Sequence, residues 1–283
     1  MMMSASCQHA SISLRTISLG AGVQSTTLAL MAAHGEITPM PDIAIFADTQ
    51  AEPAAVYEHL NWLMGPNVLP FPVAIITAGS LLDALYDPSA GIAAGARPPF
   101  MVQSKNTPGG APLNRQCTRH YKVDPLIKKV RELVGLQPGQ QGPKTPIIET
   151  WIGISTDEAH RMKPSRKRYI TNRWPLIEKR MTRWDCLLWL ERQGYPRPPK
   201  SACTFCPYRS NEAWREMRDN APADWAQAVA VDRHIRDRMP RVHNGRVFIH
   251  RSLQPLDEVD LRNDYERGQP DLFGNECEGM CGV

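Results

Sequence analysis

The 283-residue sequence has no hydrophobic run as long as the roughly 20 apolar residues that a membrane-spanning helix needs. Its first residues, MMMSASCQHASISLR, contain no apolar stretch of signal-peptide length. We therefore expect a soluble, cytoplasmic protein with no membrane partner. In a reducing compartment, clustered cysteines serve metal binding or catalysis more often than disulfide formation. We expect the seven cysteines to follow that pattern.

The sequence also has little net charge, no internal repeat and no heptad run, which argues against a repeat array or a coiled coil. The net charge of +4 is unevenly distributed, because residues 160–183 contain nine basic side chains and only one acidic one, Glu178. Such a block attracts polyanions, either nucleotide phosphates or a nucleic-acid backbone, unless it is only a solvated basic face. The nine are Arg161, Lys163, Arg166, Lys167, Arg168, Arg173, Lys179, Arg180 and Arg183.

Strand and helix patterns alternate through the first third of the chain. The apolar run DIAIFA, residues 42–47, is typical of a buried parallel strand. Pro53 precedes a stretch with apolar residues at helical spacing. The alternation predicts an α/β fold with a doubly wound, Rossmann-like parallel sheet. The predicted strands are residues 14–19, 42–47 and 71–77, and the predicted helices are residues 25–34, 54–64 and 80–86.

The rest of the chain is less regular. Residues 88–112 are rich in Gly, Ala and Pro, and we expect a mobile loop over the carboxyl edge of the sheet, where ligands bind in such folds. We expect an α/β domain at 14–200 and a helical C-terminal extension at 201–283 that carries a Cys-x-x-Cys pair and a cysteine-containing tail. Further elements are expected at 147–154 (strand), 182–193, 211–220 and 224–239 (helices) and 246–250 (strand).

The segment GAGVQST, residues 20–26, lies between the first predicted strand and the first predicted helix. Its small residues let the backbone approach a phosphate, and free amides at a helix start donate hydrogen bonds to it. The segment lacks the Gly-Lys-Ser/Thr ending of a Walker loop and does not fit the dinucleotide fingerprint. A phosphate-binding turn and a turn needed only for packing both fit this pattern.

Cys203 and Cys206 form a Cys-x-x-Cys pair, a spacing that lets two thiolates bind one metal. Two thiolates do not complete a tetrahedral site, so further ligands must come from elsewhere in the chain. Cys117 lies 86 residues before Cys203, and the tail NECEGMCGV supplies Cys277 and Cys281. Cysteines gathered from three distant segments indicate a cofactor site or a redox relay.

Four motifs, in sequence order, resemble the PP-loop superfamily of ATP pyrophosphatases and phosphoadenylyl-sulfate reductases. GAGVQS is similar to the family's phosphate loop, and FADTQAEP (46–53) to its aspartate–threonine motif. CTRHYKVDPL (117–126) resembles the cysteine motif of the reductases, and residues 174–196, which run into the Cys-x-x-Cys, resemble their Pro-Leu to Trp-x-x-x-Asp segment. The resemblance covers about residues 14–207 and implies a PP-loop fold with a site for an adenine nucleotide.

The resemblance implies that ATP or adenylyl sulfate binds at this site, with Mg²⁺ as an accompanying ion. The family's loop serine and aspartate are replaced by Gly20 and Gln24, so the loop lacks the carboxylate of the family's Mg–ATP site. Arg161 and Lys163 follow the strand predicted at 147–154 and are candidates for phosphate contacts or ordinary exposed cations. The residues expected at the nucleotide are Gly20, Ala21, Gly22, Gln24, Ser25, Thr26, Asp48, Thr49, Arg161 and Lys163.

In iron–sulfur-containing adenylyl-sulfate reductases, a Cys-Cys pair and a later Cys-x-x-Cys bind a 4Fe-4S cluster. By this resemblance Cys117, Cys203 and Cys206 are metal ligands, while Gln116 replaces the other cysteine of the pair. The fourth ligand is then Cys277, or one iron stays open for a sulfide. Zinc is the alternative metal, because it accepts the same thiolates.

The tail also resembles the Glu-Cys-Gly end of the reductases, whose cysteine is the sulfur nucleophile, although the match is divided between Cys277 and Cys281. A terminal thiol can enter a site, attack sulfur and withdraw. Both cysteines are therefore candidate catalytic residues. For Cys277 a metal ligand, a sulfur-carrying thiol and an incidental cysteine all stay open.

Three functions fit these observations. The first is ATP-dependent sulfur transfer to tRNA or DNA, in which ATP adenylates the acceptor and sulfur from a donor such as a cysteine desulfurase displaces AMP. The basic segment 160–183 favours it, because a nucleic-acid backbone uses many cations. The second is a sulfonucleotide reductase, which the tail favours. The third is a non-catalytic nucleic-acid-binding module with a structural zinc.

Overall fold

The computed structural model describes residues 11–87, 98–105, 107–237, 245–262 and 266–267. The chain divides into two compact units, each with its own hydrophobic core. The first unit comprises residues 1–47, 58–76 and 126–200, and the second comprises residues 48–57, 77–125 and 201–283. The contiguous division at residue 200 stays a prediction.

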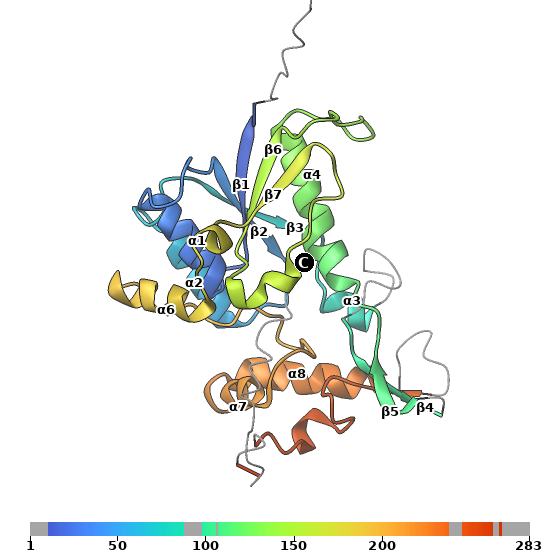
Figure 1. The fold of residues 1–283 in the computed structure, drawn as a ribbon. Helices are drawn as coiled ribbons and strands as arrows, with labels where there is room; N and C mark the ends of the chain where they lie inside the picture. Colours follow the sequence, from blue (N-terminus) through green and yellow to red (C-terminus); the bar gives the residue numbers. More distant parts are fainter. Residues whose placement is uncertain (1–10, 88–97, 106, 238–244, 263–265, 268–283) are drawn as a thin grey trace, which may run out of the picture. The chain divides into compact units, whose positions relative to one another are not determined.

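The first unit is built on a five-stranded sheet with the strand order β3-β2-β1-β6-β7 (Figure 1). The central strand β1 (Leu14–Leu19) pairs in parallel with β2 (Ile43–Asp48) on one side and β6 (Ile148–Ile152) on the other. β7 (Ile170–Arg173) pairs in parallel with β6, and β3 (Val73–Thr77) lies at the opposite edge, beside β2. The sheet order therefore reverses around β1, as in a doubly wound fold.

Helices cover both faces of this sheet, which agrees with the nearly continuous apolar runs of β2 (IAIFAD) and β3 (VAIIT). α4 (Asp124–Leu133) packs Val130 and its apolar neighbours against the sheet, whereas α1 (Val23–Ala33) and α6 (Arg183–Arg192) pack together on the other side (Figure 1). The predicted doubly wound α/β fold is thus confirmed. The helices α2 (Ala54–Leu63) and α5 (Pro175–Glu178) and the 3₁₀ turn Thr156–Arg161 complete the region.

Local sequence signals set the helix boundaries. α6 begins with a capping box, in which the Thr182 side chain accepts a hydrogen bond from Asp185 N at 3.1 Å while the Asp185 carboxylate accepts from Thr182 N at 2.8 Å. Gly194, with φ +73°, follows the end of α6. Pro175 and Pro222 stand at the starts of α5 and α8.

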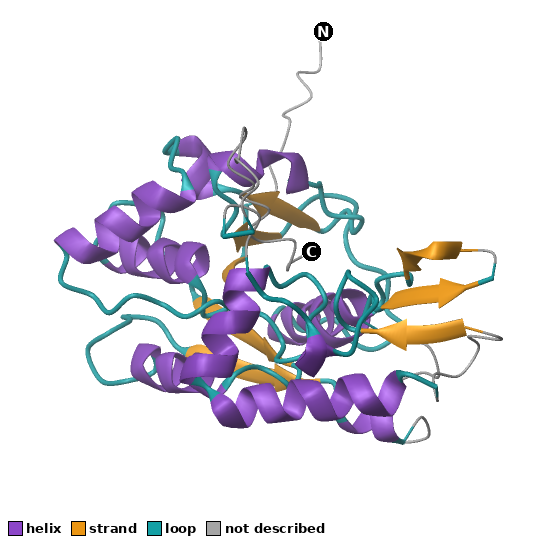
Figure 2. Ribbon diagram, turned by 90° about the horizontal axis from the view of Figure 1, so that it is seen from below, coloured by secondary structure: helices purple, strands orange, loops and turns teal. Residues whose placement is uncertain are grey.

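The second unit combines helices with a small antiparallel sheet of order β5-β4-β8, whose three strands lie side by side in Figure 2. Aromatic residues such as Phe100, Tyr121, Phe205 and Trp214 fill its core. Its elements are α3 (Asp83–Tyr86), β4 (Met101–Ser104), β5 (Thr107–Pro112), the π-helical turn Arg119–Val123, α7 (Asn211–Asn220), α8 (Pro222–Ile235), β8 (Gly245–Phe248) and the 3₁₀ turn Leu256–Glu258.

The loop expected at 88–112 is wrong for residues 101–104 and 107–112, which are the strands β4 and β5. Glycines and prolines in TPGGAP hide the strand pattern of β5. β4 is held by a distant partner, since Met101 pairs with Phe248 of β8. Residues 88–97 lie outside the described residues. No described helix is both long and apolar enough to cross a membrane.

A glycine after β6 tests how tightly this sheet packs against the turn before α1. A Cβ added to Gly153 would lie 2.9 Å from the backbone nitrogen of Ser25. Because the obstructing atoms are backbone, Gly153→Ala should lower the free energy of unfolding by about 1–3 kcal/mol in urea denaturation. At Gly109 an added Cβ meets nothing within 4 Å, so Gly109→Ala is the matched control. Equal losses in the two variants would contradict the close approach.

Candidate functional site

The turn between β1 and α1 is closed by the side chain of Ser25. The backbone nitrogens of Gly20 and Gly22 donate hydrogen bonds to Ser25 Oγ at 3.1 and 3.3 Å. Ala21 adopts φ +54°, the left-handed conformation that a turn this tight requires. The turn leads directly into α1, whose N-terminal end favours anions.

The side chain of Gln24 joins this turn to the segment after β6. Gln24 Nε2 donates to Glu158 Oε2 at 3.1 Å and to Ser155 Oγ at 3.4 Å, and Gln24 Oε1 accepts from Arg183 Nη1 at 3.2 Å. Arg161 Nη1 lies 2.6 Å from Glu158 Oε1. Burial raises the pKa of Glu158, and the positive charge of Arg161 opposes that rise. The first unit therefore carries a carboxylate beside the turn on Glu158, although position 24 is neutral.

Other residues predicted at the nucleotide have different surroundings. The Thr26 side chain is fully buried, and its Oγ1 lies 3.0 Å from His59 Nε2. Lys163 is exposed and its carbonyl accepts from Asn172. The structure thus brings Gln24 together with Arg161 through Glu158, whereas Thr26 is occupied by a buried hydrogen bond.

Asp48 and Thr49 belong to the second unit. Asp48 Oδ1 accepts hydrogen bonds from Gln50 N at 2.7 Å and from Tyr57 Oη at 2.8 Å. Burial and the hydrogen bond to Asp48 raise the pKa of Tyr57, so the phenol stays protonated and keeps donating. The Thr49 hydroxyl lies 3.4 Å from Cys203 Sγ.

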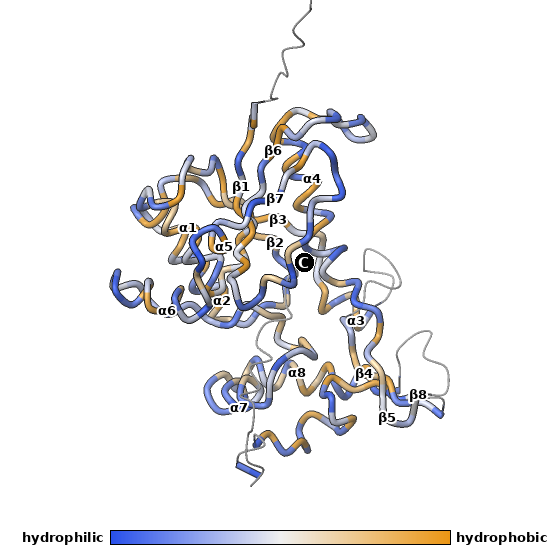
Figure 3. Tube along the Cα trace, viewed as in Figure 1, coloured by the Kyte–Doolittle hydropathy of each residue, from blue (hydrophilic) through white to orange (hydrophobic). Residues whose placement is uncertain are grey.

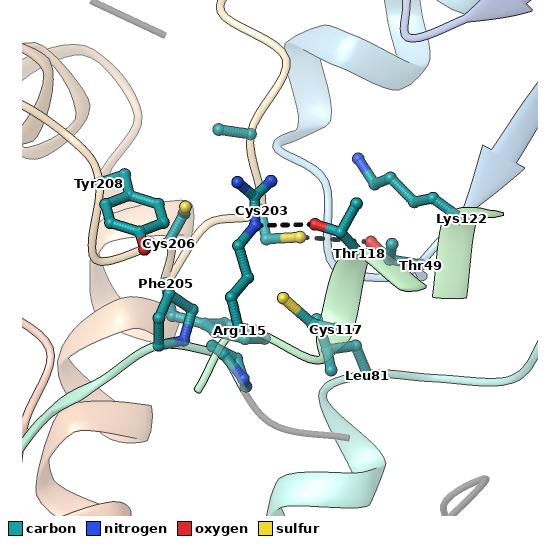
Figure 4. A pocket seen from close by; sticks show the side chains of 13 residues that line it. Thr49, Leu81, Arg115, Cys117, Thr118, Lys122, Cys203, Phe205, Cys206 and Tyr208 are labelled. Atoms are coloured by element: carbon teal, nitrogen blue, oxygen red, sulfur yellow. Dashed lines mark hydrogen bonds between the residues drawn. The ribbon is translucent and has the colours of Figure 1, made fainter. Parts of the chain in front are cut away.

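The three cysteines predicted as ligands, Cys117, Cys203 and Cys206, line one pocket of the second unit (Figure 4). Figure 4 shows the sulfur atoms of Cys117 and Cys203 turned toward the same space, while the side chain of Cys206 points toward Tyr208. The free volume of the pocket is about 40 Å³, enough for a few water molecules. Cys277 and Cys281 lie outside the described residues.

Arg209 holds the backbone of the Cys-x-x-Cys loop in place. Its Nη2 donates to the carbonyls of Ala202 at 2.6 Å and Cys203 at 3.2 Å, and its guanidinium carbon lies 5.6 Å from the centre of the Trp214 ring. Cys206 N donates to Cys203 O at 3.0 Å, which closes the turn between the two cysteines. The loop is therefore fixed by buried polar contacts rather than by a helix or strand.

Two cations and a buried carboxylate surround the thiols. Arg115 and Lys122 line the pocket, and Lys122 Nζ lies 2.9 Å from Glu52 Oε1. The Glu52 side chain is fully buried, and its Oε1 lies 3.9 Å from Cys203 Sγ. Glu52 and Arg115 were not predicted from the sequence, although Glu52 lies within FADTQAEP and Arg115 lies two residues before CTRHYKVDPL.

The thiols of Cys117 and Cys203 resist ionisation. Burial raises the pKa of Cys203 to about 12, with a further rise from the negative charge of Glu52. Burial also raises the pKa of Cys117, while Arg115 opposes the rise. Thiols of this kind become thiolates when a metal displaces the proton. Across the described part of the chain, no three His, Cys, Asp or Glu side chains converge closely enough to hold an ion, so the ligand assignment stays a prediction.

The hydrogen bond from α1 to His59 predicts a pH dependence of stability. Burial lowers the pKa of His59 to about 4, whereas the unfolded chain binds a proton near pH 6.5. The contribution of neutral His59 to the free energy of unfolding is therefore fully present above pH 6.5. It is lost as the pH falls toward 4, because the unfolded state then binds a proton that the folded state does not. Urea denaturation should show about 2 kcal/mol more loss between pH 7 and pH 4 in the wild type than in His59→Gln. Parallel pH profiles would contradict this.

Comparisons with known proteins are few. No protein-family model matches the chain, and no curated protein matches it. Among solved structures, the chain is similar to the crystal structure of phosphoadenylyl-sulfate (PAPS) reductase from Candida auris in a phosphate complex. The identity is 12% and the TM-score is 0.42, over 65% of this chain and 74% of the reductase. A likeness of this size carries no inference about activity.

Proposed function

We propose that the protein is an adenine-nucleotide-binding enzyme of the PP-loop type that works in sulfur chemistry, with ATP-dependent sulfur transfer to a nucleic acid as its reaction. One observation carries the proposal. Cys117 and the Cys203–Cys206 pair, which lie 86 residues apart in sequence, line one pocket together with two cations. A pocket built from thiols and cations suits the handling of a sulfur anion or a metal that binds one.

The turn before α1 supports the nucleotide half of the proposal. In that step an acceptor oxygen attacks the α-phosphorus of ATP, the bond to the β-phosphate breaks, and pyrophosphate leaves with its negative charge. The start of α1, together with Arg161 and Arg183 beside Gln24, favours that charge. Gln24 adds no negative charge of its own, so Glu158 and the adjacent Asp157 are the carboxylates available to orient these cations or a Mg²⁺ ion.

The cysteine pocket supports the sulfur half. Hydrosulfide attacks the adenylated carbon, the carbon–sulfur bond forms, and AMP leaves with the former acceptor oxygen, with no net oxidation or reduction in this displacement. Where the donor is a cysteine desulfurase, its sulfur arrives as a persulfide, and a thiol reductant must first release the hydrosulfide and is itself oxidised to a disulfide. The proposed cofactor has two forms, a 4Fe-4S cluster and a zinc ion, and Cys117, Cys203 and Cys206 would hold either. A metal bound there would act as a Lewis acid that binds sulfide. Arg115 and Lys122 would offset the negative charge of the thiolates.

The basic block supports a nucleic acid as acceptor. Its nine cations divide into two groups. Arg161, Arg173 and Arg183 are half-buried and bond to Glu158, Glu178 and Gln24. The other six are exposed and form no ion pair with a described residue, and Figure 3 shows the stretch leading into β7 as strongly hydrophilic. They are Lys163, Arg166, Lys167, Arg168, Lys179 and Arg180.

The nucleotide half is tested by calorimetric titration of the full, anaerobically purified chain with ATP. Arg183→Gln should weaken ATP binding about tenfold or more, because one charge-assisted hydrogen bond to phosphate is lost. Arg192→Gln, an exposed arginine at the end of the same helix, should bind like the wild type.

Three results would redirect the proposal. A wild-type chain that binds no adenine nucleotide would remove it. Nucleic-acid binding without nucleotide binding would favour the zinc module. Release of sulfite from adenylyl sulfate would favour the reductase.

The acceptor half is tested by the salt dependence of duplex binding. Replacing Lys163, Arg166 and Lys167 with Gln should reduce the slope of log K against log salt by about 2–3, since each phosphate contact contributes about 0.9. The control replaces three exposed lysines outside the block with Gln, namely Lys105, Lys128 and Lys144, and should keep the wild-type slope. Equal slopes in the two triple variants would show that the block does not contact phosphates.

A further inference from the structure

Trp184, in the first turn of α6, exposes its indole ring to solvent. Its exposed fraction is 65%, the largest among the exposed large hydrophobic side chains of the described residues. The chain has seven tryptophans, all within the described ranges, and the other six are buried or half-buried. Removing an aromatic ring of this size from water is strongly favourable, so the exposed indole is a surface suited to a binding partner.

The indole lies on the outer face of α6. The inner face buries Cys186 and Leu190, and the Cys186 side chain contacts Thr27 of α1, the helix on which α6 packs. In a helix with 3.6 residues per turn, Trp184 stands about 160° around the axis from Cys186. Its ring is therefore turned away from the core of the first unit.

Hydrogen bonds fix the turn that carries Trp184. Thr156 N donates to Met181 O at 2.9 Å, and Arg183 N donates to Asp157 Oδ1 at 3.1 Å, so the turn is tied to the segment after β6. The capping box then holds the first residues of α6 in place. An aromatic side chain carried on such a fixed backbone has little conformational freedom to lose when a partner stacks on it.

Cations lie just before this turn in the chain. Lys179 and Arg180 are exposed, and neither forms an ion pair with a described residue. The acidic side chains close to them in sequence are already bonded, because Glu178 pairs with Arg173 at 2.8 Å and the Asp185 carboxylate serves the capping box. The chain around the indole therefore carries an excess of positive charge, which fits a polyanion.

The backbone at Arg180 supports a role for its charge. Arg180 follows the end of α5 with φ +56°, the left-handed conformation that glycine adopts most easily. The hydrogen bonds from Met181 N to Leu176 O and from Arg180 N to Ile177 O, both 2.9 Å, hold it there. A side chain in this conformation is less stable than glycine, and such strain is typical of functional positions.

We infer that Trp184 stacks on an unpaired base of a single-stranded nucleic acid, while Lys179 and Arg180 contact the neighbouring phosphates. An aromatic ring beside cations suits a single strand, because every base has a face that stacks and every nucleotide carries a phosphate. The bases of a duplex are already stacked on one another, so the strand is unpaired at this point. The inference rests on the proposed function and names the state of its acceptor.

The position of Trp184 relates the stacked base to the turn before α1. Trp184 directly follows Arg183, whose Nη1 donates to Gln24 Oε1 at 3.2 Å. The indole thus lies one residue from a side chain that reaches the proposed phosphate turn, and both belong to the first unit. Enzymes that modify a base act on it outside the stack, which an unpaired strand already provides.

The test compares two single strands of equal length and charge, an oligothymidylate and an abasic strand, by fluorescence anisotropy with the full chain. The wild type should bind the oligothymidylate about 5- to 150-fold more tightly, the effect of stacking one base. Trp184→Ala should lose this preference and bind the abasic strand like the wild type, whereas Trp184→Phe should keep most of it. The same titrations with oligouridylate distinguish an RNA from a DNA strand.

Two further variants separate stacking from charge. Tyr86→Ala removes another exposed aromatic side chain, in α3 of the second unit, and should keep the wild-type preference. Replacing Lys179 and Arg180 with Gln should reduce the slope of log K against log salt by about 1.4, since each phosphate contact of a single strand contributes about 0.7. Trp184→Ala should leave that slope unchanged. Circular dichroism of each variant establishes that its fold is retained.

Four outcomes overturn the inference. They are a wild-type preference in Trp184→Ala, a wild type that binds both strands equally, an equal loss of single-strand and duplex affinity in Trp184→Ala, and dimers that Trp184→Ala dissociates with unaltered strand affinity. The last result, measured by sedimentation velocity, would assign the indole to a second copy of the chain.

ATP titration of the same samples separates this inference from the nucleotide half of the proposed function. Strand binding as expected in a chain that binds no ATP supports the stacking and overturns the nucleotide half alone. ATP binding by the wild type, together with wild-type strand binding in Trp184→Ala, overturns the stacking alone.

Discussion

The ion pair between the buried carboxylate of Glu52 and the half-buried Lys122 is the interaction on which the second unit's pocket depends. It joins the segment after β2 to the π-helical turn that follows Cys117, and the Ala51–Thr204 hydrogen bond adds the Cys-x-x-Cys loop to the same assembly. A buried charge pair is costly unless further partners complete it. One oxygen of Glu52 has none among the described residues, and burial keeps two thiols protonated nearby.

The first unit depends on a different constraint, the close approach of backbone segments at the carboxyl edge of its sheet. Gly153 leaves no room for a side chain beside Ser25, and the amides of Gly20 and Gly22 fold back onto the Ser25 hydroxyl. The side-chain amide of Gln24 then connects two residues, because its Nε2 donates to Glu158 and its Oε1 accepts from Arg183. A neutral side chain at this position adds no further negative charge to Glu158 and Asp157, the two carboxylates that lie beside Arg161 and Arg183.

Much of the fold could be predicted from the sequence, because β2 and β3 are apolar runs separated by helical periodicity and the Gly-rich turn after β1 marks the start of α1. The hairpin of β4 and β5 could not, since TPGGAP carries no strand pattern and β4 pairs with a strand more than a hundred residues away. Within the candidate site, the cysteines were identified by their spacing and lie at one pocket. Glu52 was missed, because an isolated glutamate gives no sign in sequence that it will be buried against Cys203. The hydrogen bond from Arg183 to Gln24 was hidden in the same way, because Arg183 lies in a block of cations that looked uniform in sequence.

The most direct test of this account is the metal content of the full chain, purified without oxygen and without added metal, measured as zinc, iron and acid-labile sulfide per chain. The account predicts a metal centre in the cysteine pocket, either four irons with four sulfides or about one zinc per chain. A metal-free chain in which Cys117, Cys203 and Cys206 are all open to alkylation would contradict the account.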